Sequence, residues 1–280
     1  MLENMNNILK NAKKDKYCVP QFNINNLEWT RFILEEASVE KSPVILGVSE
    51  GAAKYMGGYK LIVSMVKELI SYLNIDVPVA LHLDHGSSFE VCKEAIDAGF
   101  TSVMIDASKK SLEENINITK KVVAYASNYN VSVEAEIGQI NNDIDDETMY
   151  ADVKECQIFY KETHINALAP ALGSVHGLYK GDPKLDFDRM FEISNLLNIP
   201  LVLHGGTGIN DELLKQAISC GICKLNINTE LQIEWSKNVR KYLSENNDVY
   251  DPRKIIKAGE LAMKKAIQNK IYVLGSNNRA

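Results

Sequence analysis

Short apolar runs alternate with longer amphipathic segments along the chain of 280 residues. The runs have the length of β-strands, and the longer segments repeat apolar residues near helical spacing, as Trp29, Phe32, Ile33 and Ala37 do. The runs are almost continuously apolar, which is typical of a parallel sheet covered on both faces. The pattern predicts strands at residues 17–23, 43–49, 77–85, 102–106, 131–138, 167–172, 200–203 and 223–228.

Helices are predicted at residues 27–41, 59–73, 87–99, 112–129, 153–163, 187–197 and 211–220, and two more, at about 231–243 and 252–268, end the chain. Strand–helix units repeated in this way favour an α/β fold of the (β/α)8 TIM-barrel type over an open sheet. A Rossmann fold is less favoured because no G-x-G-x-x-G motif follows the first strand. Residues 1–280 contain no recognisable linker and are predicted to form a single domain with extra C-terminal helices.

Three histidines follow predicted strands. Asp84 and His85 end the third strand in the motif LHLDHG, His176 follows the sixth strand, and His204 follows the seventh. A barrel gathers the carboxyl ends of its strands at one face, where the active sites of such enzymes lie. Zinc enzymes commonly use three protein ligands and keep one position open. We therefore predict that these three histidines bind a divalent metal, with zinc preferred.

The other histidines and two glutamates have different expected roles. His82 lies within the third strand and is expected in the barrel interior, and His164 precedes the sixth strand, at the end associated with stability. Glu134 and Glu136 share one face of the fifth strand because side chains alternate with a period of two. Glu136, nearer the strand end, is a candidate for an alternative metal position, whereas Glu134 is expected to belong to a structural network.

Further polar residues fall at the carboxyl ends of predicted strands: Asn23, Ser49, Asp106, Asn226 and Asn228. A single buried polar residue usually only satisfies hydrogen bonds. A whole set at one end of one barrel favours an active site.

A glycine-rich segment, Gly205 to Gly208, follows the seventh strand. Backbone N–H groups that glycines leave accessible, with the start of the next helix, can bind an anion. The loop after the seventh strand of a barrel is also a usual phosphate site. Gly177 and Lys180 could complete such a site, although Lys180 could equally be a solvated loop lysine.

Composition limits the class of partner. The formal net charge of -6 comes without long runs of one sign, which gives no support for nucleic-acid binding and leaves anionic substrates open. No apolar run approaches the roughly 20 residues of a membrane-spanning helix, and the N-terminus does not resemble a signal peptide. The C-x-x-C of Cys220 and Cys223 is interpreted as two ordinary thiols. A reduced, cytoplasmic protein is expected.

Several motifs in combination resemble the class II, metal-dependent ketose-bisphosphate aldolases, in particular the bacterial fructose-bisphosphate aldolases: LHLDHG, SVMIDAS, VEAEIG, APALGSVHG, LVLHGGTGI and LNINTE. The likeness runs over almost the full length, from QFNINNLE to YDPRK and the closing GSNNRA.

The resemblance implies reversible cleavage of fructose 1,6-bisphosphate to dihydroxyacetone phosphate and glyceraldehyde 3-phosphate, in glycolysis and gluconeogenesis. His85, His176 and His204 would hold Zn2+, a Lewis acid at the ketose C2 carbonyl. Asp84 would take the proton of the C4 hydroxyl. Glu136 matches the carboxylate associated with the alternative zinc position.

The resemblance also implies how substrate and subunits meet. The dihydroxyacetone phosphate half would contact Gly177, Lys180, Gly205, Thr207, Asn226 and Thr229, and family members often need a monovalent cation, Na+ or K+, near that phosphate. Arg253 matches an arginine that reaches the other phosphate from a neighbouring subunit, which implies a homodimer or homotetramer.

Two positions bear on substrate choice and proton transfer. Asn228 matches the fructose-type members, which carry Asn or Asp here, whereas tagatose-type relatives tend to carry Ala. In the family, a loop glutamate after the fifth strand exchanges a proton of dihydroxyacetone phosphate. Here the loop looks shortened, and a gap-free comparison puts Ile144 at that place. Asp143 or Asp145 is expected to carry this proton instead.

Three alternatives remain open at this stage. The chain could cleave tagatose 1,6-bisphosphate, or be a catalytically impaired barrel that binds metal and phosphate, an interpretation that only the altered loop supports. A lysine could also form a Schiff base, with Lys224 nearest to a strand end. The complete histidine set, Asp84 and the glycine-rich segment argue against an impaired barrel, which would be expected to lose some of them. A metal site makes an imine unnecessary, which argues against the Schiff base.

Overall fold

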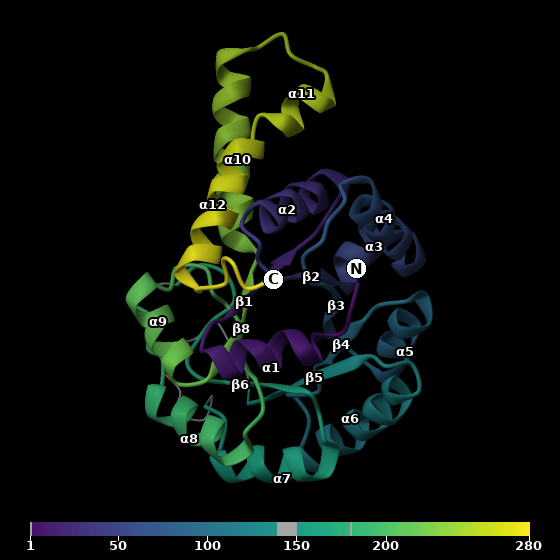
Figure 1. Ribbon diagram of the computed structural model, residues 1–280, viewed down its shortest axis with the longest axis vertical. Coiled ribbons are helices and arrows are strands. Elements are labelled where there is room, and N and C mark those ends of the chain that lie inside the picture. The colour runs from purple at the N-terminus through teal and green to yellow at the C-terminus, as the bar shows by residue number, and fades with distance from the viewer. Residues whose placement is uncertain (1, 139–149, 180) are drawn as a thin grey trace.

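The computed structural model describes residues 2–138, 150–179 and 181–280, and at its centre is a closed barrel of parallel strands (Figure 1). Each strand pairs with the next, and β1 pairs with β8, which places Gln21 beside Asn226. The predicted (β/α)8 barrel is confirmed. The strands are β1 (Val19–Asn23), β2 (Val44–Ser49), β3 (Val79–Gly86), β4 (Ser102–Ile105), β5 (Ser132–Ile137), β6 (Ala167–Pro170), β7 (Leu201–Leu203) and β8 (Ile222–Ile227).

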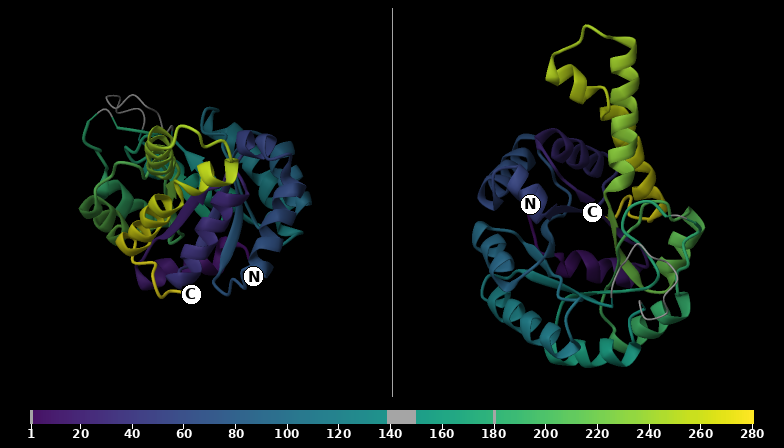
Figure 2. Two further views of the ribbon diagram at one scale, coloured as in Figure 1. Left: turned by 90° about the horizontal axis from the view of Figure 1, so that it is seen from above. Right: turned by 180° about the vertical axis from the view of Figure 1, so that it is seen from behind.

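Helices surround the barrel (Figure 2). Their apolar faces pack against the outer side of the sheet, in a core that includes Phe32, Val103 and Phe159. Among the described helices, none combines the length and apolar character needed to cross a bilayer. The helices are α1 (Met5–Asp15), α2 (Leu27–Val39), α3 (Glu50–Tyr55), α4 (Tyr59–Tyr72), α5 (Phe89–Ala98), α6 (Leu112–Ser127), α7 (Val153–Thr163), α8 (Phe187–Leu197), α9 (Asp211–Ser219), α10 (Thr229–Glu245), α11 (Pro252–Lys257) and α12 (Glu260–Val273).

Near the amino ends of the strands, the interior of the barrel is filled by apolar side chains, several of them alanines. The helix α1 lies across this end (Figure 1) and buries Ile8 and Leu9. These side chains belong to one cluster with barrel residues Val19, Ile45, Ala80, Ala167, Ala169, Val202 and Cys223. The barrel is therefore closed at its amino end, and polar side chains gather at the carboxyl end.

Two helices, α1 and α3, were not predicted from the apolar pattern. Each begins at a polar residue that caps it: Asn4 accepts a hydrogen bond from the backbone N–H of Asn6, and Ser49 accepts one from that of Ala52. Such caps satisfy donors that a helix start leaves unpaired.

The single helix predicted at 252–268 is wrong, because the structure has α11 and α12 there, with a break before Glu260. A Cβ atom at Gly259 would lie 2.3 Å from the ring of Trp235. The same ring donates a hydrogen bond of 3.1 Å from Nε1 to the carbonyl of Ile256. Contact with Trp235, distant in sequence, therefore fixes the break.

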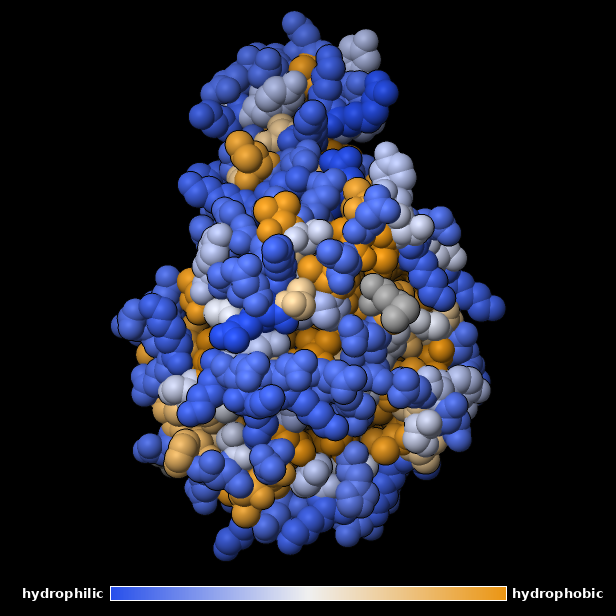
Figure 3. Space-filling model, in the orientation of Figure 1, coloured by the Kyte–Doolittle hydropathy of each residue, from blue (hydrophilic) through white to orange (hydrophobic). Residues whose placement is uncertain are grey.

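The helices α10 and α11 form an arm that projects from the barrel (Figures 1 and 2). In the arm, α11 buries no residue, and α10 buries only Leu231 and Val239. The surface of the arm is mostly hydrophilic, with scattered hydrophobic side chains (Figure 3).

Candidate active site

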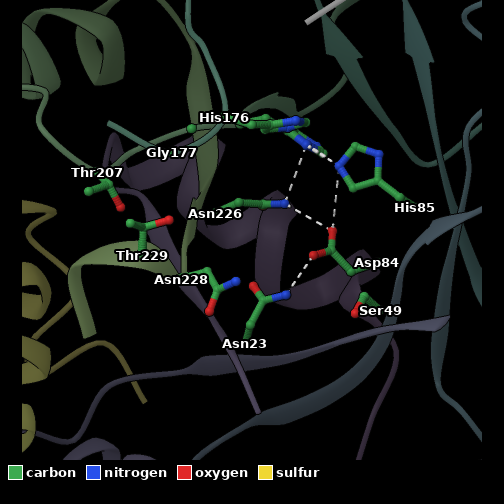
Figure 4. Close-up of a pocket in the computed structure, with 12 residues that line it drawn as sticks. Asn23, Ser49, Asp84, His85, His176, Gly177, Thr207, Asn226, Asn228 and Thr229 are labelled. Atoms are coloured by element: carbon green, nitrogen blue, oxygen red, sulfur yellow. Dashed lines mark hydrogen bonds and ion pairs between the residues drawn. The ribbon is translucent and has the colours of Figure 1, made fainter. Parts of the chain in front are cut away.

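A pocket opens at the carboxyl end of the barrel (Figure 4). Its lining residues come from β1, β2, β3 and β8, from the segments after β6 and β7, and from the start of α10. The structure thus brings together most of the residues that the sequence singled out: Asn23, Ser49, Asp84, His85, His176, Gly177, His204, Gly205, Thr207, Asn226, Asn228 and Thr229.

A β-bulge lets two successive residues of β3 face this pocket. Side chains normally alternate between the two faces of a strand, yet Asp84 and His85 both line the pocket. The pairing of β3 with β4 shifts register between Leu83 and Gly86. His85 lies in the shifted segment with φ of 56°, a left-handed conformation that few non-glycine residues adopt. The bulge therefore turns the imidazole of His85 toward the pocket.

Three imidazoles meet at the pocket. Nδ1 of His204 lies 3.0 Å from Nε2 of His85, and a ligand nitrogen of His176 lies within 4.8 Å of the other two. Two nitrogens that bind one tetrahedral zinc at about 2.0–2.1 Å are separated by about 3.4 Å. The three side chains are close enough to share one ion.

Carboxylates hold the opposite ring nitrogens of two of these histidines. Oδ2 of Asp106 lies 3.0 Å from Nδ1 of His85, and Oε1 of Glu134 lies 3.1 Å from Nε2 of His204. Partners of this kind fix the tautomer that leaves the other nitrogen available to a metal. The available nitrogens are the two that face each other, so the donor set fits zinc.

The carboxylates also make the site favour positive charge. Burial alone would lower the pKa of His85, but the hydrogen bond to Asp106 and the charges of Asp84 and Glu136 raise that pKa to about 9. Burial lowers the pKa of His176 to about 4 and also lowers the pKa of His204. The imidazoles of His176 and His204 therefore stay neutral, as metal ligands must be, whereas a metal that binds His85 would displace a proton from it.

Two amides hold the carboxylate of Asp84 (Figure 4). Nδ2 of Asn23 donates to Oδ2 at 2.8 Å, and Nδ2 of Asn226 donates to Oδ1 at 3.2 Å. Burial would raise the pKa of Asp84, but the charges of His85 and Lys224 outweigh burial and hold the pKa well below its ordinary value. Asp84 is therefore ionised at neutral pH and can accept a proton.

The other side of the pocket suits an anion. Gly177 and Gly205 have φ of 88° and 67°, and a Cβ atom at Gly205 would lie 2.0 Å from the carbonyl oxygen of Val175. The helix α10 begins at Thr229, which itself lines the pocket. The start of a helix carries positive potential and unpaired N–H groups that attract phosphate.

The remaining candidates lie elsewhere. Glu136 is not a pocket-lining residue, but its carboxylate, with His85 and Asp106, forms a second group of possible ligand atoms within 4.8 Å. Arg253 lies on α11, its side chain is 90% exposed, and it pairs with Asp251 at 2.8 Å. Three further candidates lie outside the described residues, as does Ile144: Asp143, Asp145 and Lys180.

Sequence reasoning missed two interactions at the site. It placed Asp106 at a strand end without assigning the bond to His85, although an acid at the end of the adjacent strand was an available signal. It also missed that Lys224 pairs with Glu134 at 2.9 Å, with both side chains 0% exposed. Because Lys224 is ion-paired and does not line the pocket, the structure gives the Schiff-base alternative no support.

The residues expected to be structural occupy the positions predicted for them. His82 is wholly buried in the barrel, with Nδ1 2.8 Å from Oγ of Ser102. His164 ends α7 in the left-handed conformation. All five cysteines are free, including Cys220 and Cys223.

Comparisons with known proteins agree with this geometry, which defines a metal-dependent enzyme of the (β/α)8 class. Residues 3–279 match the family described as "Fructose-bisphosphate aldolase class-II". A fructose-bisphosphate aldolase of Geobacillus stearothermophilus is 58% identical over 100% of this chain and 99% of its own length, and one of Staphylococcus aureus is 56% identical with the same coverage. The chain belongs to the class II fructose-bisphosphate aldolase family.

Two solved structures with aldolase titles are similar to this chain over its length. The YdjI aldolase of Escherichia coli K12 superposes with a TM-score of 0.88 at 32% identity, covering 100% of both chains. A putative fructose-1,6-biphosphate aldolase of Coccidioides immitis gives 0.87 at 29% identity, covering 98% of this chain and 96% of its own.

The hydrogen bond between Asp106 and His85 generates a prediction about metal affinity. Asp106→Ala removes the group that orients His85, and the dissociation constant for zinc should rise about 10- to 100-fold. Competition with a chromophoric chelator measures this constant. Asp97→Ala, which removes an exposed acid paired with Lys93, is the control and should leave the constant unchanged. Equal affinity in both variants would contradict the assigned role of Asp106.

Proposed function

We propose that the chain reversibly cleaves fructose 1,6-bisphosphate to dihydroxyacetone phosphate and glyceraldehyde 3-phosphate, in glycolysis and gluconeogenesis. The observation that carries this proposal is that three imidazoles and the ionised Asp84 meet in one pocket. The names of the full-length relatives support the choice of substrate.

His85, His176 and His204 are proposed to hold Zn2+, and Glu136, beside His85, would serve an alternative position of the ion. When bound, zinc supplies Lewis-acid chemistry at the ketose C2 carbonyl. Asp84 accepts the proton of the C4 hydroxyl during cleavage and returns it during condensation.

The phosphate of the dihydroxyacetone half is proposed to bind opposite the histidines. Gly177, Gly205, Thr207 and Thr229 line that side of the pocket, and the start of α10 favours negative charge there. Lys180 and a monovalent cation, Na+ or K+, would add positive charge. Three more side chains would contact the rest of the substrate: Asn23 on β1, Ser49 on β2 and Asn226 on β8.

Asn228 supports the fructose ester over its C4 epimer, tagatose 1,6-bisphosphate. Its side chain lines the pocket, and its Oδ1 is buried without a hydrogen-bond partner among the described residues. A buried acceptor of this kind is costly unless a ligand pairs with it, so Asn228 is suited to receive a substrate hydroxyl. The impaired-barrel alternative is less favoured because the histidines, Asp84 and the glycine-rich segment are all in place.

Proton exchange at dihydroxyacetone phosphate is proposed for Asp143 or Asp145. The support is their position in the sequence, beside Ile144, where the family carries a glutamate.

A second copy of the chain is proposed to complete the site. The arm buries little within its own chain, and the side chains of Tyr250 and Arg253 on it are 89% and 90% exposed. A groove beside α3 and α4 also exposes large apolar side chains, with Tyr55 79% and Tyr72 81% exposed. Exposed apolar surface of this kind marks interaction sites. We propose a homodimer or homotetramer in which Arg253 reaches the partner's site.

The rest of the sequence expectations stay proposals. The family match over residues 3–279 supports one domain over the whole chain. The five free cysteines support a cytoplasmic location.

Cleavage assays with and without a chelator test the proposed function. Zinc-loaded protein should cleave fructose 1,6-bisphosphate faster than tagatose 1,6-bisphosphate, and EDTA should abolish both activities because the metal is required. Borohydride should trap no adduct. Preference for the tagatose ester would change the substrate, and no turnover of either ester by the zinc-loaded protein would favour the impaired barrel.

Isotope exchange at dihydroxyacetone phosphate tests the loop acids. The double variant Asp143→Ala/Asp145→Ala should exchange this proton about 100-fold more slowly, the usual scale for a missing general acid or base. NMR detection of deuterium incorporation measures this rate. Asp182→Ala, an exposed acid after β6, is the control. Exchange at the wild-type rate in the double variant would rule both aspartates out.

Mixing two variants, each lacking a different residue of the proposed shared site, tests the contribution of the second copy. Asp84→Ala lacks the base, and Arg253→Ala should raise KM about tenfold, as loss of one charge-assisted contact does. In a hybrid dimer, the site that keeps Asp84 receives Arg253 from the other chain, so activity at low substrate should recover on mixing. Arg240→Ala is a change on the exposed side of α10. Mixing Asp84→Ala with Arg240→Ala gives the reference activity of a hybrid in which every site that keeps Asp84 also keeps access to Arg253. An active wild-type monomer in sedimentation would contradict the proposal.

A further inference from the structure

A fully buried ion pair lies inside the barrel. Nζ of Lys224, on β8, is 2.9 Å from Oε2 and 3.2 Å from Oε1 of Glu134, on β5. Both side chains are 0% exposed. Removing two charges from water costs several kcal/mol per ion before their attraction offsets it. A barrel interior filled with apolar side chains would avoid this cost, so the pair calls for an explanation beyond stability.

The ammonium of Lys224 makes a further contact, with a residue of the pocket. Nζ donates a hydrogen bond of 2.8 Å to Oδ1 of Asn226, two residues further along β8. An ammonium has three donors and no acceptor. The carboxamide of Asn226 must therefore turn its oxygen toward Lys224 and its nitrogen the other way.

The nitrogen of Asn226 then points to the proposed base. Nδ2 donates to Oδ1 of Asp84 at 3.2 Å, while Asn23 donates to the second carboxylate oxygen at 2.8 Å (Figure 4). If the amide of Asn226 were reversed, its oxygen would face the carboxylate of Asp84, and two acceptors would repel each other. The lysine thus selects the one orientation in which Asn226 can hold Asp84.

We infer that Lys224 is a positioning residue: it fixes the amide of Asn226 so that Asp84 stays in place to take the proton of the substrate. The inference rests on the proposed function, because it assigns Asp84 its role there. Lys224 does not touch substrate, and Glu134 serves to hold the lysine while it also orients His204.

The competing explanation is that Lys224 only neutralises Glu134. In that case removal of both charges would restore everything that loss of the lysine takes away. If Lys224 acts through Asn226, removal of both charges restores stability alone, since Oδ1 of Asn226 still lacks its donor.

The experiment is a double-mutant cycle in zinc-loaded full-length protein. The first change is Glu134→Gln/Lys224→Met, which removes the donor without leaving a buried carboxylate unpaired, and the second is Asn226→Ala. With fructose 1,6-bisphosphate, the first change should lower kcat about 10- to 100-fold, the scale of a lost hydrogen bond to a charged group, while KM changes less than about threefold. In the Asn226→Ala background the same change should lower kcat less than about twofold, because the two residues act as one unit.

Two further measurements separate positioning from folding. With zinc in excess, the unfolding temperature and the zinc content of the Glu134→Gln/Lys224→Met variant should stay close to those of the wild type, because the glutamine still offers an oxygen to Nε2 of His204. Lys264→Met is the matched control: it removes a lysine that bridges Glu35 and Glu260 on the outer helices, at 2.6 and 3.2 Å. It should lower stability without lowering kcat.

Each outcome decides the inference. Additive losses of kcat in the cycle, or wild-type kcat in Glu134→Gln/Lys224→Met, would overturn the role of Lys224. A fall in kcat accompanied by loss of zinc or of folding would overturn it as well. Wild-type protein that fails to cleave the substrate would instead refute the proposed function, so the two failures are distinguishable.

Discussion

Closure of the sheet is the constraint on which the structure depends. Because every neighbouring pair of strands in the ring is parallel, β1 with β8 included, all strands run in the same direction and every carboxyl end lies on one rim. Residues as far apart in sequence as Asn23 and Asn226 therefore bind the same carboxylate. The geometry of the ring, rather than a local sequence motif, brings the residues of the pocket together.

The polarity of the barrel interior changes along its axis. Alanines and other apolar side chains fill the end beneath α1, the pair of Glu134 and Lys224 lies above them, and amides and imidazoles line the pocket. Burying charge at mid-depth has a cost that an apolar filling would not have. The charges have a function that offsets this cost when they orient side chains of the pocket, as Glu134 orients the ring of His204.

Much of the site could be predicted because each residue follows a recognisable strand. Asp84, His85 and His204 come directly after apolar runs, and barrel geometry does the rest. The contacts behind them could not be predicted, since the bond between His85 and Asp106 joins residues 21 positions apart, and the β-bulge at His85 has no signal in composition. The break at Gly259 depends in the same way on Trp235, 24 positions earlier by residue number. The loop with Asp143 and Asp145 lies outside the described residues, and its role stays a prediction.

The helix across the closed end of the barrel affects the order in which the chain can fold. Its partners lie much later in the chain: the backbone N–H of Met5 bonds to Ser132, and Nζ of Lys13 bonds to the carbonyl of Ile199. At the other terminus, the N–H of Asn278 bonds to the carbonyl of Glu40. During synthesis this amphipathic helix therefore cannot make all its contacts until the segment just before β7 has emerged. Both segments are fixed by contacts between residues far apart in sequence, which makes the native barrel a late, cooperative product of folding.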